Sequence, residues 1–359
     1  MTRHYSIAFI PGDGIGVDVL GEGRKVLDAL SSLDGGLKIG YQEFDWSCEY
    51  YMNNGVMMPE NGLDQLKGHD SIYLGAVGYP GVPDHVSLWG LLLPIRRQFQ
   101  QYINLRPVKL LRGIKPPLAG KGLEDLDFIV IRENNEGEYS SIGGRMYEGT
   151  EMDMAIQSAV FTRHGVERVL RYAFSLASSK GKRKKLTAAT KSNGINHTMP
   201  FWDEYVRKIN SEYPDVATEI THIDALAAFF VTKPESFDVV VASNLFGDIL
   251  TDLGAAIVGG LGIAPSANIN PEKNFPSMFE PVHGSAPDIA GKGIANPTAA
   301  IWCAGMMLDH LGEYELAAVL MESLQQVLEE GAALTPDLGG KASTWEFGDE
   351  VCRKILGKG

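Results

Sequence analysis

The sequence predicts an α/β fold built on a parallel sheet. Short apolar runs such as Val239–Ala242 are typical of strands that are buried on both faces. Such a run is followed by residues with helical periodicity, as Ile249, Leu250 and Leu253 follow Val239–Ala242. The chain shows no internal repeat and no low-complexity stretch. Strands that alternate with helices in this way indicate the α/β class.

The same two patterns place the individual elements. Strands are expected at Tyr5–Ile10, Asp70–Leu74, Phe128–Ile131, Leu186–Thr190, Thr218–Ile223 and Val239–Ala242. Helices are expected from after Gly16 to Leu30 and at Leu91–Gln100, Met154–Leu176, Met199–Asn210, Ala225–Val231, Thr298–Leu311, Ser323–Glu330 and Thr344–Leu356. Two glycine-rich stretches are expected to depart from regular structure, Gly254–Ala267 in places and Glu280–Pro297 throughout.

The glycines after the first strand do not form a dinucleotide fingerprint. The segment reads Pro11-Gly-Asp-Gly-Ile-Gly16, and Val17 stands where the third glycine of G-x-G-x-x-G belongs. The motif therefore does not support a Rossmann fold.

Composition excludes several classes of function. The net charge of −13 and the isoelectric point of about 5.1 argue against binding to nucleic acid or to anionic membranes. The basic run Lys180–Lys185 is expected to be a solvated loop, and the three cysteines lack the spacing of a zinc site or a disulfide framework. Ile7–Ile10 is too short for a signal peptide, and no stretch is long enough to span a membrane. We expect a soluble, cytoplasmic protein.

Two aspartates on the helix after Val239–Ala242 are the first candidates for a metal site. Asp248 and Asp252 are four residues apart, so both carboxylates leave the same face of the helix. One interpretation is a solvated helix face, with Asp248 offsetting the helix dipole. The other is a ligand pair for Mg²⁺ or a similar hard cation, because Asp248 lies just beyond the carboxyl end of a buried strand, where α/β sheets bind ligands.

Other strands end in similar residues. Arg132, Lys191 and Asp224 each follow an expected strand. Taken singly, Asp224 is also explained as a helix N-cap, Lys191 as a surface lysine, and the arginines as salt-bridge partners. Taken together, they favour chemistry on a polycarboxylate that is bound to a divalent metal, with arginines binding the carboxylates.

Five motifs show that the chain resembles the metal-dependent β-decarboxylating 2-hydroxyacid dehydrogenases, which act on isopropylmalate, isocitrate, tartrate or D-malate. The motifs are IPGDGIG at Ile10, NLRP at Asn104, RENNEGEY at Arg132, NLFGDILTD at Asn244 and EPVHGSAPDIAGKGIANP at Glu280. The resemblance runs from Ile10 to about Gly340. It is strongest to the tartrate and D-malate members, on DHVSLWGLLLPIRR at Asp84 and the run from VVASNLFGDIL to GIAPSANINPE.

The resemblance implies a two-lobed, non-Rossmann fold with the active site in the cleft between the lobes and at a dimer interface. The large, NAD-binding lobe would comprise residues 1–108 and 259–359. Residues 109–258 would form the smaller lobe, with the dimer interface and the metal and substrate residues. The implied assembly is a homodimer with shared active sites, or a higher oligomer built from such dimers, without nucleic acid or membrane partners.

The resemblance also implies roles for individual residues. Arg96, Arg106 and Arg132 would bind the substrate carboxylates. Asp248 and Asp252 of one chain, with Asp224 of the other, would bind Mg²⁺ or Mn²⁺ together with the substrate. Lys191, also from the partner, would take the hydroxyl proton as hydride passes to NAD⁺, and Tyr139 would protonate the enol after CO₂ leaves. Asp224 is thus both a metal ligand and a member of the catalytic group.

A further loop would bind the cofactor. His283, Gly284, Ser285, Ala286 and Asp288 would surround the adenosine, and Asn296 would contact the adenine. An aspartate at 288 would accept hydrogen bonds from the ribose and repel a 2′-phosphate, so NAD⁺ is expected rather than NADP⁺. K⁺ is a further cofactor typical of the family, to which no ligands are assigned.

The residues before Arg96 predict a small substrate. Isopropylmalate enzymes place a glutamate seven residues before the equivalent arginine, where this chain has Trp89. Isocitrate enzymes place serine and asparagine six and four residues before it, where this chain has Gly90 and Leu92. The expected substrates are therefore (2R)-2-hydroxy diacids: D-malate, giving pyruvate and CO₂, and tartrate, giving oxaloglycolate or, from the meso form, glycerate. Alternatives are a 3-isopropylmalate dehydrogenase, a non-catalytic regulatory subunit, and a metal-dependent lyase without nucleotide.

Overall fold

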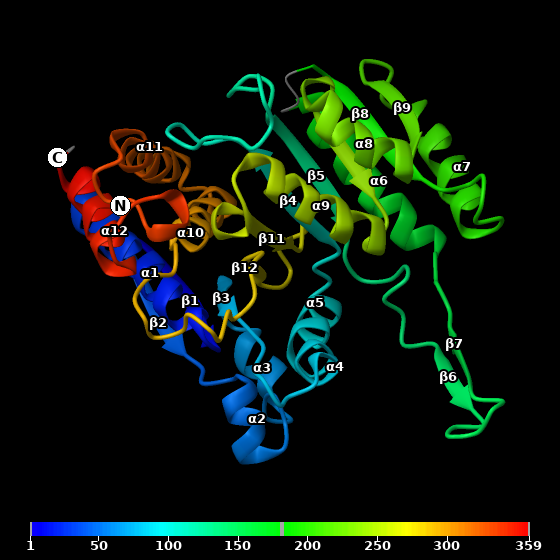
Figure 1. Ribbon diagram of the computed structural model, residues 1–359, viewed down its shortest axis with the longest axis horizontal. Coiled ribbons are helices and arrows are strands. Elements are labelled where there is room, and N and C mark those ends of the chain that lie inside the picture. Colours follow the sequence, from blue (N-terminus) through cyan, green and yellow to red (C-terminus); the bar gives the residue numbers. More distant parts are fainter. Residues whose placement is uncertain (1, 180–182, 358–359) are drawn as a thin grey trace. The chain divides into compact units, whose positions relative to one another are not determined.

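A computed structural model describes residues 2–179 and 183–357, and the chain divides into two compact units. Unit 1 comprises Met1–Gln101, Lys109–Leu123 and Ala255–Gly359, and unit 2 comprises Tyr102–Val108 and Glu124–Gly254. Each unit has its own strands and covering helices (Figure 1). The α/β class expected from the sequence is confirmed.

The division differs from the expected lobe boundaries at residues 102–123 and at residues 255–258, which fall in unit 1. Tyr102–Val108 falls in unit 2, where strand β4 (Ile103–Lys109) neighbours strand β5 (Asp127–Glu133). Lys109–Leu123 falls in unit 1, where Arg112 forms an ion pair of 2.8 Å with Glu322. Strand pairing and ion pairs, rather than position in the sequence, decide which unit each segment joins. The division of roles between the lobes remains a prediction.

The sheet of unit 1 has the strand order β2-β1-β3-β12-β11. These strands span β1 Arg3–Gly12, β2 Leu37–Glu43, β3 Ser71–Ala76, β11 Pro265–Ile269 and β12 Ser277–Pro281. Strands β2, β1, β3 and β12 run parallel, with Ile10 opposite Leu74 and Phe279 opposite Tyr73, and β11 is antiparallel to β12. The parallel strands therefore end at one edge, at Gly12, Ala76 and Pro281.

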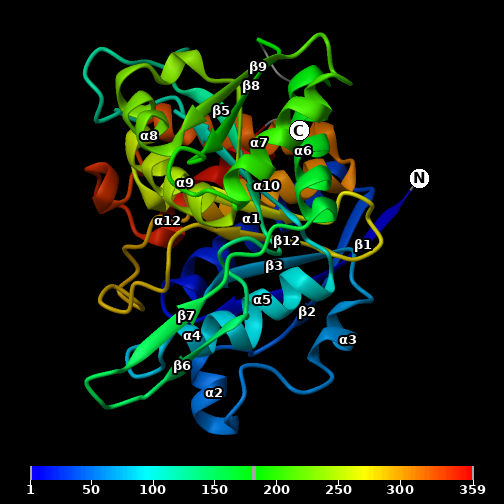
Figure 2. The ribbon, with the colours of Figure 1, turned by 90° about the vertical axis from the view of Figure 1, so that its right-hand side faces the viewer.

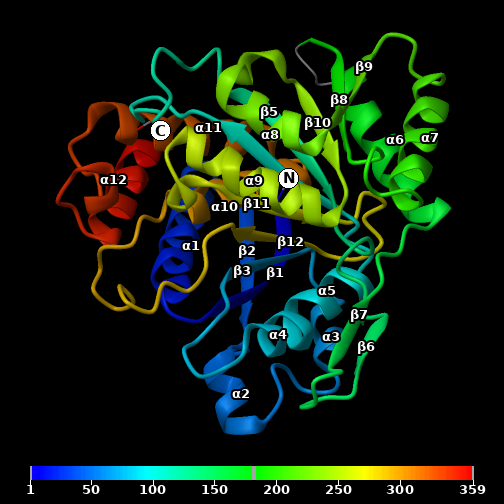
Figure 3. The same cartoon turned by 45° about the vertical axis from the view of Figure 1, so that its right-hand side comes forward.

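Helices cover both faces of this sheet. On one side lie α1 (Ile15–Asp34), α10 (Thr298–Leu311), α11 (Tyr314–Glu330) and α12 (Thr344–Leu356), as Figure 3 shows. On the other side lie α2 (Cys48–Asn54), α3 (Gly62–Leu66), α4 (Asp84–Ser87), a π-helical turn (Leu88–Leu92) and α5 (Leu93–Gln98). The core of the second side includes Ile72, Leu74, Leu91, Ile95 and Phe99.

The sheet of unit 2 has the strand order β4-β5-β10-β8-β9. Its other strands are β8 Lys185–Thr190, β9 Ala217–His222 and β10 Val239–Ala242. Strands β5, β10, β8 and β9 are parallel. In Figure 3, α6 (Arg163–Ser179) and α7 (Thr198–Asn210) lie on one side of these strands, and α8 (Ile223–Thr232) and α9 (Asn244–Val258) lie on the other.

The expected helix Met154–Leu176 is wrong in its first part. Residues Met154–Gln157 form strand β7, which pairs antiparallel with β6 (Gly143–Met146), and α6 begins only at Arg163. Both strands are exposed throughout and form an extended ribbon in Figure 2. Met154 and Ile156 alternate with other residues, as in a strand, but a four-residue segment is too short for its period to be read with certainty.

Other departures concern short elements. Strands β2 and β12 were not expected, and Gly254–Ala267 continues α9 to Val258 before a 3₁₀ turn (Leu261–Ile263) and β11. Further 3₁₀ turns lie at Pro234–Ser236 and Pro336–Leu338. Part of the expected loop Lys180–Lys185 lies outside the described residues, and Lys185 begins β8. Among the helices described, none combines the length and apolar character needed to cross a membrane.

Candidate active site

The strand pairing of unit 2 brings Arg132 to the start of α9. Strands β5 and β10 are parallel and in register, with Arg132 opposite Ala242, and α9 begins two residues later at Asn244. Helix α9 then packs closely on the arginine at Gly247. A Cβ built at Gly247 would lie 2.5 Å from the Cβ of Arg132, a distance that side chains do not tolerate. The glycine of NLFGD therefore allows the helix to approach Arg132.

Arg132 is nearly fully buried and is held by two residues of α9. Its Nε and Nη2 donate to Oδ1 of Asn244 at 3.0 and 2.8 Å, and its Nη1 donates to Oδ1 of Asp248. The guanidinium also lies 5.4 Å from the ring centre of Tyr139. The hydroxyl of Tyr139 donates to the other oxygen of Asp248, Oδ2, at 2.7 Å. One carboxylate thus holds both the expected substrate arginine and the expected proton donor.

Arg106 approaches the same carboxylate from β4. Its Nη1 donates to Oγ1 of Thr251 at 2.5 Å and lies 3.7 Å from a carboxylate oxygen of both Asp248 and Asp252. Burial and the neighbouring charge of Asp248 raise the pKa of Asp252, an effect that Arg106 opposes. The pair is therefore not a simple solvated face, because positive side chains lie beside it.

The residues of this cluster fit a divalent cation in part. Asp248 and Asp252 supply carboxylate oxygens from one helix face, which are the ligands that Mg²⁺ and Mn²⁺ prefer. A cation between them would also oppose the burial and the charge of Asp248, which together raise the pKa of Asp252. Among the described residues, no three His, Cys, Asp or Glu side chains are grouped closely enough to hold a metal ion. Asp224 therefore does not complete the set within one chain.

Asp224 and Lys191 form a separate pair within unit 2. Asp224 lies in the first turn of α8, and Lys191 follows β8. Lys191 Nζ lies 2.9 Å from Oδ1 of Asp224, and the hydrogen bond from this ammonium lowers the pKa of Asp224. Both side chains remain partly exposed. The structure thus joins the two residues that were expected to serve a partner's site.

Arg96 and Trp89 belong to unit 1. Arg96 is buried and donates from Nη2 to Oε1 of Glu280 at 2.6 Å, and Asn268 donates to the same oxygen at 2.7 Å. Trp89 lies in the π-helical turn, and the guanidinium of Arg97 lies 4.9 Å from its ring. The expected substrate role of Arg96 remains a prediction, and in this structure its Nη2 is bonded to Glu280.

The expected cofactor loop follows β12 at the carboxyl edge of the unit 1 sheet. The carbonyl of Ser285 accepts from the backbone N–H of Ile15 at 2.8 Å, and Ala286 adopts a left-handed conformation with φ 39°. His283 has a buried Nε2 without a hydrogen-bond partner, and burial lowers the pKa of its imidazole. A buried, unsatisfied nitrogen of this kind fits a loop that is completed by a polar ligand.

The two polar ends of this loop differ. Asp288 is exposed, and so can meet ribose hydroxyls. Asn296 is buried, and its amide donates to Asp337 at 2.9 Å and accepts from the N–H of Thr298 at 3.0 Å. Each end of an amide can make two hydrogen bonds, so both ends of Asn296 retain capacity for a ligand. These side chains fit an adenosine site.

Reasoning from the sequence missed three residues that support the cluster. Asn244 and Thr251 hold Arg132 and Arg106, and Glu133 is a buried carboxyl group behind them. Burial raises the pKa of Glu133 to about 7, although the N–H groups of Asn135 and Glu136 donate to its carboxylate. All three missed residues lie inside the motifs at Arg132 and Asn244. Their membership of these motifs was the feature of the sequence that could have identified them.

Comparison with known proteins defines the family. Residues 6–351 match the isocitrate/isopropylmalate dehydrogenase profile. The chain is 54% identical over 354 residues to a probable tartrate dehydrogenase/decarboxylase of Bacillus subtilis, with 98% of both chains covered. It is 55% identical over 363 residues to the decarboxylating D-malate dehydrogenase of Escherichia coli, covering 99% of this chain and 100% of that one.

The fold agrees with the sequence comparison. A crystal structure of isocitrate dehydrogenase from Methylococcus capsulatus matches with a TM-score of 0.88 and 34% identity, covering 98% of this chain and 99% of that one. The chain belongs to the isocitrate/isopropylmalate dehydrogenase family. This confirms the resemblance identified from the motifs and the expectation that the chain belongs to a family of enzymes.

Proposed function

We propose that this protein is an NAD⁺-dependent, divalent-metal-dependent enzyme that oxidises and decarboxylates small (2R)-2-hydroxy diacids. D-malate would give pyruvate and CO₂, and tartrate would give oxaloglycolate or, from the meso form, glycerate. The observation that carries the proposal is the convergence of Arg106, Arg132 and Tyr139 on Asp248. The names of the relatives from B. subtilis and E. coli support the choice of substrates.

The arginines would bind the two carboxylates of the substrate. Arg106 and Arg132 are buried and are held in place by Thr251 and Asn244, so little conformational entropy is lost when they bind. Guanidinium groups bind carboxylates through paired, charge-assisted hydrogen bonds. A dicarboxylate therefore suits this site better than a monocarboxylate.

Asp248 and Asp252 of one chain, with Asp224 of the partner subunit, would hold Mg²⁺ or Mn²⁺. When bound, the metal would polarise the substrate oxygen and NAD⁺ would accept the hydride. Asp288 would favour NAD⁺ over NADP⁺, because its carboxylate would repel a 2′-phosphate. K⁺ is included among the proposed cofactors on the family resemblance, without assigned ligands.

Two side chains would move protons at each site, one from each subunit. Lys191 of the partner subunit would accept the proton of the substrate hydroxyl, and Tyr139 would give its proton to the enol carbon after CO₂ departs. Tyr139 donates its hydrogen to Asp248, which directs the hydroxyl toward the expected metal and substrate site. Lys191 is paired with Asp224, so the same chain would supply both a base and a metal ligand to its partner.

A homodimer follows from the same argument. The described residues contain no complete three-carboxylate cluster, whereas a second chain would add the missing aspartate. The ribbon of β6 and β7 carries exposed apolar side chains that suit contact with another protein surface. These residues are Ile142, Met146, Tyr147, Met152, Met154 and Ile156.

The test is NADH formation from a panel of 2-hydroxy diacids, with Mn²⁺ and K⁺ present. D-malate or a tartrate should be oxidised, whereas L-malate should not, and EDTA should stop the reaction. Faster oxidation of 3-isopropylmalate than of these substrates would favour a 3-isopropylmalate dehydrogenase. If the protein binds nucleotide but none of the diacids gives NADH, a regulatory subunit is favoured. If a diacid is converted without nucleotide, a lyase is favoured.

A further inference from the structure

The candidate site contains four charged side chains whose charges cancel. Asp248 and Asp252 contribute two carboxylates, and Arg106 and Arg132 contribute two guanidinium groups. Arg132 forms an ion pair with Oδ1 of Asp248, and Nη1 of Arg106 lies 3.7 Å from a carboxylate oxygen of each aspartate. These four residues, all in unit 2, are called the four-charge cluster. The arginines expected to bind substrate are thus paired with the aspartates expected to bind a metal ion.

Two neighbouring glutamates have hydrogen-bond donors of their own. Backbone N–H groups of the residues that follow donate to Glu133, and burial raises the pKa of this carboxyl group to about 7. The hydroxyl of Ser243 and the N–H of Leu245 donate to Glu138 at 2.8 and 3.0 Å. The charged groups that act on the pKa of Asp252 are the other three members of the four-charge cluster. The four-charge cluster therefore balances its own charge.

Each arginine of the four-charge cluster is also held by a neutral oxygen. Nε and Nη2 of Arg132 donate to Oδ1 of Asn244 at 3.0 and 2.8 Å, whereas Nη1 donates to Asp248. Nη1 of Arg106 donates to Oγ1 of Thr251 at 2.5 Å. These hydrogen bonds do not involve the aspartates. Both guanidinium groups can therefore keep their positions when Asp248 takes another partner.

This balance of charge disfavours the binding of either ligand alone. A divalent cation at the two aspartates would leave the four-charge cluster with an excess of positive charge. A dicarboxylate at the two arginines would leave an equal excess of negative charge, and both ligands together would restore neutrality. Excess charge is costly here because Arg106 and Arg132 are buried, where an unpaired charge is poorly solvated.

We propose that Arg132 is the counterion of Asp248 in the unliganded protein, and that it thereby couples the binding of a divalent cation to the binding of a dicarboxylate. The inference rests on the proposed function and adds a means of regulation to the same site. Asp248 exchanges Arg132 for the cation, and Arg132 exchanges Asp248 for a substrate carboxylate. Coupling between two sites is reciprocal, so each ligand raises the affinity for the other by the same factor.

Replacement of Arg132 by methionine should have opposite effects on the two ligands. It removes the group that competes with the cation for Asp248, so Mn²⁺ alone should bind at least about tenfold more tightly. It also removes a carboxylate-binding group, so D-malate alone should bind at least about tenfold more weakly. A purely structural role for Arg132 would instead weaken the binding of both ligands.

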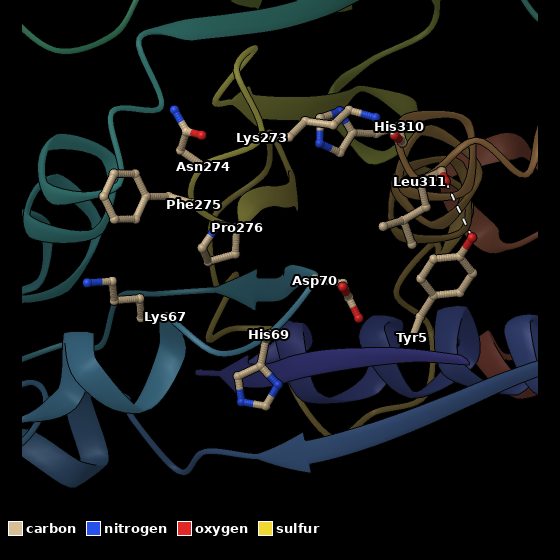
Figure 4. A pocket seen from close by; sticks show the side chains of 10 residues that line it. All are labelled: Tyr5, Lys67, His69, Asp70, Lys273, Asn274, Phe275, Pro276, His310 and Leu311. Atoms are coloured by element: carbon tan, nitrogen blue, oxygen red, sulfur yellow. Dashed lines mark hydrogen bonds between the residues drawn. The ribbon is translucent and has the colours of Figure 1, made fainter. Parts of the chain in front are cut away.

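Two charged residues outside the four-charge cluster supply matched controls. A polar cavity of about 370 Å³ lies in unit 1, and Asp70 is the carboxylate among the lining residues that Figure 4 labels. One oxygen of Asp70 accepts from the N–H of Ser6 at 2.8 Å. Arg163 lies on α6, where its exposed side chain pairs with Glu167 at 3.0 Å. Asp70→Asn and Arg163→Met should leave the Mn²⁺ affinity of the candidate site unchanged.

Mn²⁺ binding to the full chain, without substrate or nucleotide, tests the inference. Electron paramagnetic resonance of free Mn²⁺ measures the affinity, and the relevant site is the one that Asp248→Asn weakens. Arg132→Met should tighten binding at this site. In the Asp248→Asn background the same replacement should have at least several-fold less effect, because the carboxylate that pairs with Arg132 is gone. Saturation-transfer NMR measures D-malate binding without metal or NAD⁺.

The inference is overturned if Arg132→Met lowers the Mn²⁺ affinity or leaves it unchanged, or if it acts equally in both backgrounds. Each of these results leaves the proposed function standing, because NADH formation from D-malate is measured separately on the wild-type protein. Absence of Mn²⁺ binding from both the wild type and Arg132→Met would overturn the inference together with the proposed metal dependence.

Discussion

The hydroxyl of Tyr139 donates a hydrogen bond to Oδ2 of Asp248 at 2.7 Å, while Oδ1 of the same carboxylate accepts one from Arg132. A single aspartate thereby fixes the positions of a phenol and a guanidinium that lie 109 and 116 residues before it in the sequence. If Asp248 also binds the metal, the proton donor and one substrate arginine are positioned relative to the metal by the same side chain. The predictions below separate these roles.

Replacement of Tyr139 by phenylalanine should remove the proton donor and keep the ring beside Arg132. General acids contribute about 10²–10⁴ in rate, so kcat for D-malate should fall by that order while NADH still binds. Steady-state kinetics and NADH fluorescence measure the two effects. Tyr314→Phe, which alters an exposed tyrosine at the start of α11, is the matched control and should change kcat little. A Tyr139→Phe enzyme with normal turnover would remove Tyr139 from the mechanism.

Replacement of Asp248 by asparagine should weaken the metal site, because it keeps the size of the side chain and removes a ligand charge. The Mn²⁺ concentration for half-maximal activity should rise at least about tenfold, and excess Mn²⁺ should restore part of the activity. A titration of initial rate against Mn²⁺ measures this, with Asp64→Asn on α3 as an exposed control. An unchanged Mn²⁺ dependence would show that Asp248 only organises its neighbours.

Glu133 should make stability depend on pH. Burial raises the pKa of this carboxyl group from 4.5 to about 7, so its protonated form is favoured in the folded state. The stabilisation is present below pH 4.5 and is lost as the pH rises through 7. The free energy of unfolding of Glu133→Gln, minus that of the wild type, should therefore be more positive at pH 8 than at pH 5, by about 1–3 kcal/mol.

Urea unfolding at pH 5 and pH 8 measures the difference between Glu133→Gln and the wild type. Glu124→Gln, at an exposed position of unit 2, serves as the control and should show no such trend. An equal difference at both pH values would mean that Glu133 is ionised throughout this range.

Much of the candidate site could be predicted from the sequence because its parts lie next to strand ends. The strand Val239–Ala242 and the helix after it were placed correctly, and their junction brings Asp248 to Arg132. Side-chain pairing was less predictable. The ion pair between Arg96 and Glu280 joins residues that are 184 positions apart, and no local pattern indicates it.

Other parts of the fold were missed for physical reasons. Strand β12 merges with a stretch rich in glycine and proline, which conceals its apolar residues. The strands β6 and β7 are four residues long and exposed throughout, so neither carries an alternation of apolar and polar residues long enough to mark a strand. The third expected metal ligand, Asp224, does not join Asp248 and Asp252 among the described residues, and its place in a partner's site remains a prediction.

The residues that precede Arg96 should make the enzyme select small substrates. Trp89 would occupy the space of a branched substituent, and Gly90 and Leu92 cannot hydrogen-bond a third carboxylate through their side chains. We expect kcat/KM for D-malate or a tartrate to exceed that for 3-isopropylmalate and isocitrate by at least about tenfold, roughly 1.4 kcal/mol. Trp89→Ala should reduce the ratio of kcat/KM for D-malate or a tartrate to kcat/KM for 3-isopropylmalate. Wild-type preference for isopropylmalate would refute this selection and leave the fold unaffected.

Sharing of the active site between chains can be tested by complementation. Lys191→Met and Arg132→Met homodimers should both be nearly inactive. A doubly tagged heterodimer of the two variants would retain one site with both residues intact, and should show about half of the wild-type activity. If Lys191 and Arg132 serve the same chain's site, the heterodimer would remain as inactive as its parents.

The most direct test of the proposed reaction measures NADH and CO₂ together from D-malate, with NAD⁺ and Mn²⁺ supplied to the wild-type protein. Oxidative decarboxylation predicts that the two products form at equal rates and that both cease when EDTA removes the metal. Formation of NADH without CO₂ would identify a simple dehydrogenase. Formation of neither from D-malate or any tartrate would contradict the proposed function itself.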